Sequence, residues 1–84
     1  MPKTKLNRPR LTPAQIRARI VRSAADRVGM CRDRDLADIL SLSGPGMSSR
    51  LNGTRPWRLD DLTVLAARID LTDDEIVRFV RGQE

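Results

Sequence analysis

The sequence predicts an all-α fold, a compact five-helix bundle in one domain. The chain has 84 residues with one Trp, one Phe and no Tyr, so Leu, Ile, Val, Met and Ala must form the core. Apolar residues recur at three- and four-residue spacings, as in helices. The alternation of β-branched and aromatic residues that is typical of strands is scarce. A chain of this length supports one domain with a small core.

The first helix is expected to begin after Thr12, with Pro13 at its first position and Gln15 completing a capping box. Gly29 would end it in the left-handed conformation. Its buried stripe is expected to comprise Ile16, Ile20, Val21, Ala24 and Val28. The preceding residues, 1–10, are polar, cationic and interrupted by Pro, so we expect a flexible N-terminal arm before a domain over 11–84.

Two short helices around a tight turn are predicted next. We expect Asp33 to cap the first, which runs to about Leu40, and Ser43 to cap the second. The apolar stripe of the first contains Leu36, Ala37 and Leu40, with Ile39 at its edge, and that of the second contains Met47 and Leu51. The side opposite Met47 and Leu51 carries small or polar residues, namely Pro45, Ser49 and Asn52 flanked by Gly46 and Ser48. This side could approach another molecule closely.

The last two helices are predicted from Leu59 to Ile69 and after Thr72, which forms a second capping box with Glu75. Leu59, Leu62, Leu65, Ala66 and Ile69 are expected to face inward from the first, and Ile76, Phe79 and Val80 from the second. Trp57 precedes them and is expected to cover the core between the third and fourth helices. A base-stacking role for Trp57 is the alternative.

The charge is unevenly placed along the chain. The net charge is +5, but residues 1–58 hold 13 Lys and Arg against 4 Asp and Glu, whereas residues 59–84 hold 3 against 7. The basic part contains the two short helices and favours a polyanionic partner. The single Cys31 excludes an internal disulfide, and with no His a zinc site is implausible.

The pattern Leu36-Ala37, then Ser41-Leu42-Ser43, then a helix ending at Asn52-Gly53 resembles the Cro and phage-repressor type of helix-turn-helix. The resemblance extends over residues 11 to 81. It implies a fold that reads DNA with its third helix in the major groove. It also implies base contacts from Gly44, Pro45, Ser48 and Ser49, and phosphate contacts from Ser43, Asn52 and Arg55. Ser48, Ser49 and Asn52 could instead be ordinary exposed residues, and Asn52 could serve only the turn with Gly53.

Two positions depart from that family. Ser41 stands where Gly is usual, so either a left-handed conformation there costs about 1 kcal/mol or the turn has a different shape. Arg50 stands where an apolar residue is frequent, and we expect its stem to follow the edge of the core while its guanidinium reaches a phosphate. Contacts to phosphate or to a groove are also expected from the arm residues Lys3, Lys5, Arg8 and Arg10, which could otherwise be a solubilising tail.

The sequence thus predicts a double-stranded DNA operator as partner and a Cro-like or repressor-like regulator, of phage or prophage type, that blocks a promoter. A weak homodimer on DNA is expected through Val77, beside Arg78 and Arg81. The alternatives are an antitoxin that also binds a toxin, and a protein-binding anti-repressor module. We expect no enzyme activity, cofactor, metal, small-molecule ligand or membrane association, and action in the cytoplasm at the nucleoid.

Overall fold

Five helices form the part of the chain that the computed structural model describes, residues 11–83. They are α2 (Pro13–Arg27), α3 (Asp33–Leu40), α4 (Gly44–Leu51), α5 (Leu59–Arg68) and α6 (Asp73–Arg81). No strand occurs between residues 11 and 83, and the all-α, five-helix prediction is confirmed. The expected arm, with Lys3, Lys5, Arg8 and Arg10, lies outside the described residues.

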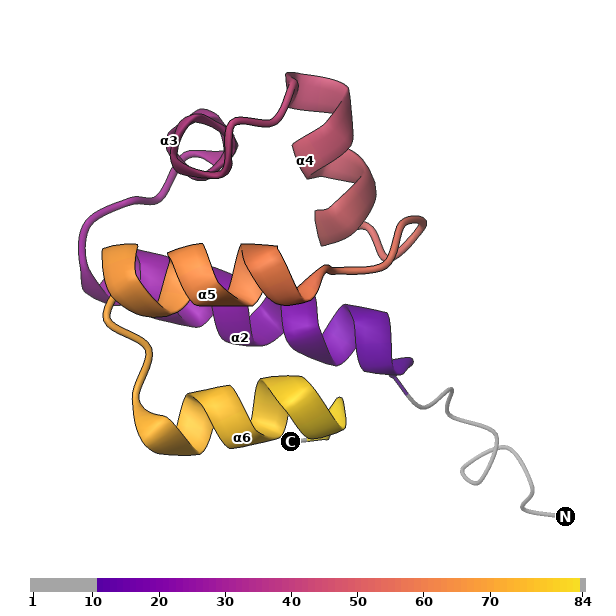
Figure 1. Ribbon diagram of the computed structural model, residues 1–84. Helices are drawn as coiled ribbons and strands as arrows, with labels where there is room; N and C mark the ends of the chain where they lie inside the picture. Colours follow the sequence, from indigo (N-terminus) through magenta and orange to yellow (C-terminus); the bar gives the residue numbers. More distant parts are fainter. Residues whose placement is uncertain (1–10, 84) are drawn as a thin grey trace, which may run out of the picture.

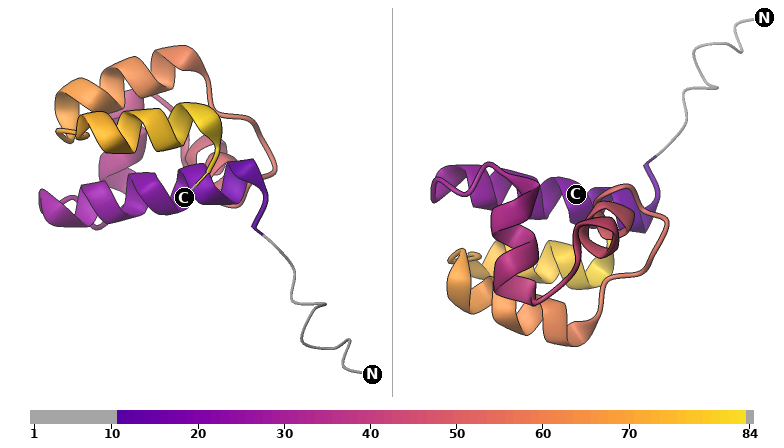
Figure 2. Two further views of the ribbon diagram at one scale, coloured as in Figure 1. Left: turned by 90° about the horizontal axis from the view of Figure 1, so that it is seen from below. Right: turned by 90° about the horizontal axis from the view of Figure 1, so that it is seen from above.

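The helices are arranged in three levels. Figure 1 shows α3 and α4 above, α2 and α5 between, and α6 below. In Figure 2, α6 lies between α5 and α2 when seen from below, and α3 spans from α2 towards α5 when seen from above. The buried core comprises Ala18, Ile20, Val21, Ala24, Ala25, Leu36, Ala37, Met47, Leu51, Leu62, Leu65, Ile69, Leu71 and Phe79. This core draws on every helix, so each helix depends on the others for its burial.

Three predicted N-terminal caps are present. Thr12 Oγ1 accepts from the Gln15 backbone N–H, and Thr72 Oγ1 accepts likewise from Glu75. Both capping boxes are complete, since the Gln15 and Glu75 side chains accept from the Thr12 and Thr72 N–H groups. Ser43 Oγ accepts from the Gly46 N–H at 3.1 Å and caps α4. These contacts span three residues, so local sequence suffices to specify them.

The predicted cap of α3 is wrong. α3 begins at Asp33 itself, its N-cap is Arg32, and no side chain caps it. Asp33 Oδ1 instead accepts from Arg22 Nη1 at 3.1 Å, in an exposed ion pair between α3 and α2. An Asp is favoured both as an N-cap and, through the helix dipole, in the first turn of a helix. The residue type therefore did not show which of these two positions Asp33 takes.

Ser41 has φ 56° and ψ 40° in the turn between α3 and α4, so of the two expected alternatives the structure shows the left-handed conformation. This left-handed conformation reverses the chain, and the Leu42 N–H then donates to the Ala37 carbonyl at 2.9 Å. Three residues therefore suffice to connect α3 to α4. The strain at a non-glycine residue here is about 1 kcal/mol.

Three residues that were expected to face the core are exposed instead, namely Val28, Leu59 and Val80. Val28 is the C-cap of α2, and Leu59 is the first residue of α5. At both positions the apolar pattern of the sequence continues beyond the part of the helix that other helices cover. Val80 follows Phe79 by about 100° around α6, so both cannot face α2. Val77 was expected to point away from the core, and it does. Trp57 is half-buried against the core, as expected of a residue that covers it, and its ring packs on Phe79 of α6 with ring centroids 5.7 Å apart.

Arg27 and Glu75 join the end of α2 to the beginning of α6. The two guanidinium Nη atoms donate to the two carboxylate oxygens at 2.9 and 2.8 Å, and Nη2 also donates to the Asp70 carbonyl at 3.0 Å. The hydrogen bonds from Arg27, aided by the Thr72 backbone N–H, lower the pKa of Glu75 from 4.5 to about 2 although burial opposes this shift. The deprotonated form is therefore favoured by folding.

We expect acid to destabilise the fold through Glu75. Because its pKa is lower in the folded chain, its contribution is complete above pH 4.5 and is lost as the pH falls from 4.5 to about 2. The loss should be about 2 kcal/mol, since exposure of Arg27 to solvent weakens the pair. Urea unfolding across this pH range will measure it, and Glu75→Gln should remove this part of the acid dependence. An unchanged pH profile in that variant would contradict the assignment.

Candidate nucleic-acid interface

The outward side of α4 is small and polar. Gly44, Pro45 and Ser48 are exposed on it, with Ser43 before and Asn52 after the helix. Met47 and Leu51 lie on the opposite side and are buried in the core. The predicted rotation of this helix is therefore present, and a flat ligand could approach its backbone without meeting a large side chain.

Several hydroxyl and amide groups on this side also bond within the chain. Ser49 is half-buried, and its Oγ donates to the Pro45 carbonyl at 2.8 Å. Asn52 Nδ2 donates to Ser48 Oγ at 3.4 Å, so these two exposed side chains form one polar group at the end of α4. Base contacts from Gly44, Pro45, Ser48 and Ser49 stay a prediction, and Ser48 is the more accessible of the two serines.

The two glycines of α4 differ in what surrounds them. A Cβ at Gly46 would lie 3.2 Å from Ser43 Oγ, so packing restricts that position. A Cβ at Gly44 would meet no atom within 4 Å. The internal packing of the described chain thus gives no reason for Gly at position 44, although Gly costs helix stability relative to Ala.

Arg50 corrects the prediction of a phosphate contact. Its residue surface is 7% exposed, and its Nε donates to Asp61 Oδ2 at 2.9 Å. Its Nη1 donates to the Gly46 carbonyl at 3.4 Å, and Asp61 Oδ2 accepts a second hydrogen bond from the Arg58 N–H at 2.9 Å. Asp61 is the buried acceptor that turns Arg50 inward. Asp61 lies in the first turn of α5, where the helix dipole also favours an acidic residue.

A basic hollow lies beside the beginning of α4. It has a volume of about 430 Å³ and is lined by Leu42, Ser43, Gly46, Arg50, Arg55, Pro56 and Arg58. Arg55 and Arg58 are exposed, so two cations and the Ser43 hydroxyl border one concave surface. Arg58 was not among the site residues predicted from the sequence. Its position immediately before α5, in the same loop as Arg55, is the feature that could have indicated it.

The remaining predicted site residues lie on α6. Val77 and Arg81 are exposed, and Arg78 Nε donates to Asp74 Oδ2 at 2.9 Å within the helix. α6 lies at the level furthest from α3 and α4 (Figure 1), so these residues do not join the α4 surface. A homodimer contact through them stays a prediction.

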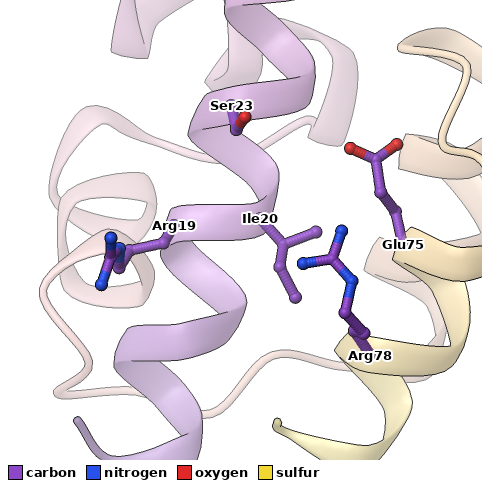
Figure 3. Close-up of a pocket in the computed structure, with 5 residues that line it drawn as sticks. All are labelled: Arg19, Ile20, Ser23, Glu75 and Arg78. Atoms are coloured by element: carbon purple, nitrogen blue, oxygen red, sulfur yellow. The ribbon is translucent and has the colours of Figure 1, made fainter. Parts of the chain in front are cut away.

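A second cavity, of about 160 Å³, lies between α2 and α6. Figure 3 shows Glu75 and Arg78 extending from α6 on one side of it, with Arg19, Ile20 and Ser23 on α2. Glu75 is bound to Arg27, and Arg78 to Asp74. Because both α6 groups serve ion pairs of the fold, this cavity does not define a ligand site.

Residues 11–83 contain no cluster of three or more His, Cys, Asp or Glu side chains that could hold a metal ion. In the same range no helix combines the length and apolar character needed to cross a membrane. Comparisons of the chain with known protein families, with curated proteins and with solved structures found no match. The function is therefore inferred from the surface of α4 and the basic hollow beside it.

Removal of the Asp61 carboxylate should destabilise the fold. Asp61→Ala leaves the buried Arg50 guanidinium without its counter-ion, and we expect a loss of about 3 kcal/mol of unfolding free energy. Asp33→Ala is the matched control, because the exposed Arg22–Asp33 pair should contribute less than about 1 kcal/mol. Urea unfolding compares the two variants. Equal losses would show that the Arg50–Asp61 pair is no more important than a surface pair.

Proposed function

We propose that this protein is a sequence-specific, double-stranded DNA-binding transcriptional regulator of the Cro-like or repressor-like kind. In this proposal α3 and α4 form a helix-turn-helix, and α4 enters the major groove. The protein blocks a promoter by occupying its operator, and it acts in the cytoplasm at the nucleoid. The observation that carries the proposal is the small, polar outward side of α4 beside the basic hollow of Arg55 and Arg58.

The two parts of this surface suit the two kinds of contact that DNA recognition needs. Gly44, Pro45 and Ser48 leave room for base edges near the α4 backbone. Arg55 and Arg58 border a concave surface that can take a phosphate, and Ser43 can donate its hydroxyl proton there. In this proposal Arg55 and Arg58 position α4 on the DNA backbone, and the small residues of α4 contact the base edges.

Selection of bound sequences from a random pool of DNA duplexes tests the proposal. A recurring sequence motif of one half-site or more is the expected result. Absence of any band shift with duplex DNA at low salt would refute it and would favour the protein-binding alternative.

Gly44→Ala should separate folding from binding. The added methyl group meets no atom of the described chain, so thermal stability should stay the same or rise slightly. If DNA lies against this position, affinity for the selected duplex should fall about tenfold, equivalent to about 1.4 kcal/mol. Ser23→Ala is the control, because it is an equally small change at an exposed position of α2, outside α4. Parental affinity in Gly44→Ala would contradict the proposed approach.

Arg55→Ala and Ser48→Ala should affect DNA binding in two different ways, the first through overall affinity and the second through base preference. Loss of a phosphate contact at Arg55 should weaken binding to all duplexes and reduce the slope of log affinity against log salt by about 0.9. Ser48→Ala should change the preference at one base position with little change in that slope. Salt titrations on matched and mismatched duplexes measure both. If Arg55→Ala changed the base preference and Ser48→Ala reduced the salt slope, α4 would have to be rotated differently on DNA.

A further inference from the structure

An apolar groove opens at the end of the molecule where α5 begins and α6 ends. Its volume is about 220 Å³. Trp57, Leu62 and Phe79 form its apolar floor, and Leu59 and Val80 stand at its edges. Figure 1 shows the start of α5 and the end of α6 at the same end of the bundle. The groove lies on a different level from the outward side of α4.

The edges of this groove are unusually exposed for large apolar residues. Leu59 is 76% and Val80 59% exposed, more than Val77 at 45% and Val28 at 38%. Scattered apolar residues on a surface are ordinary, whereas two beside one apolar groove mark a contact surface. A Leu side chain has the size to fill part of such a groove.

The charges around the groove indicate what fits it. Arg17 and Arg58 line it, and no carboxylate does. Arg17 is held in place, because its Nε and Nη2 donate to the Phe79 and Val80 carbonyls at 2.8 and 3.3 Å. Arg58 is exposed. A matching occupant therefore presents an apolar side chain with a carboxylate next to it.

The chain itself carries that pair of groups. Leu59 is followed by Asp60, which is also exposed, at the first two positions of α5. Leu59 and Arg58 thus lie beside the groove, and the exposed Asp60 is the next residue along α5. A surface that is complementary to itself is what a two-fold dimer requires, since each partner offers the same patch.

We infer that two copies of this chain associate through this surface, with Leu59 of each copy in the groove of the other and Asp60 facing Arg58 across the interface. This contact uses the beginning of α5 and the end of α6, in place of the contact centred on Val77, Arg78 and Arg81 that the sequence predicted. The association needs no DNA, so its failure and failure of the proposed function can be told apart.

Sedimentation of the full chain without DNA, over a range of concentrations, tests the inference. The parent should form dimers, and Leu59→Asp should weaken the association about tenfold or more, because a charge replaces the apolar knob. Val77→Asp is the matched control, since it places the same charge on an exposed valine outside the groove lining. It should associate like the parent. Circular dichroism melting checks that both variants fold.

Trp57 provides a second measurement, because it is the only Trp of the chain and lies in the groove. Its fluorescence should change with protein concentration in the parent and in Val77→Asp but not in Leu59→Asp. A charge reversal extends the test: Asp60→Arg should weaken association, and Arg58→Asp added to it should restore association.

A parent that stays monomeric at all concentrations overturns the inference. So does parental association in Leu59→Asp. The inference is also overturned if Val77→Asp loses association while Leu59→Asp keeps it. That result would indicate a contact through the exposed side of α6.

Discussion

The buried ion pair between Arg50 of α4 and Asp61 of α5 is the constraint on which the placement of α4 depends. α4 has eight residues, among them two Gly and one Pro, and such a helix has little stability of its own. Met47 and Leu51 bury one side of it, and the ion pair joins it to α5. A buried charge is costly without its partner, so rotation of α4 away from Asp61 is disfavoured. The outward side of α4 is consequently held in one orientation.

Asp61 also ties the loop before α5 to the same point. One of its oxygens accepts from both Arg50 Nε and the Arg58 N–H. The backbone at Arg58 is therefore held in place while its side chain stays exposed between the basic hollow and the apolar groove. In the proposed regulator, the contact with phosphate and the contact between copies would share this loop. Association of two copies would then help to set the position of each α4 relative to its partner.

The fold and the candidate site differ in how well the sequence predicted them. The five helices follow from apolar periodicity and from capping pairs that lie three residues apart, such as Thr12 with Gln15. The exposed side of α4 follows from the positions of Met47 and Leu51 on the same helix. Arg50 could not be placed in this way, because a long basic side chain at the edge of a core can extend either to solvent or to a buried carboxylate. Nothing local to Arg50 reveals that Asp61 is there.

By itself the sequence determined where the helices lie along the chain and which side of α4 is free, because these features depend on neighbouring residues and on helical periodicity. Only the tertiary structure decided that Arg50 serves the core, that Glu75 binds Arg27 and that Leu59 and Val80 border an open groove. The physical reason is that burial and ion pairing depend on which helices come together. Arg27 and Glu75 are 48 residues apart, and no pattern within a single helix encodes that proximity.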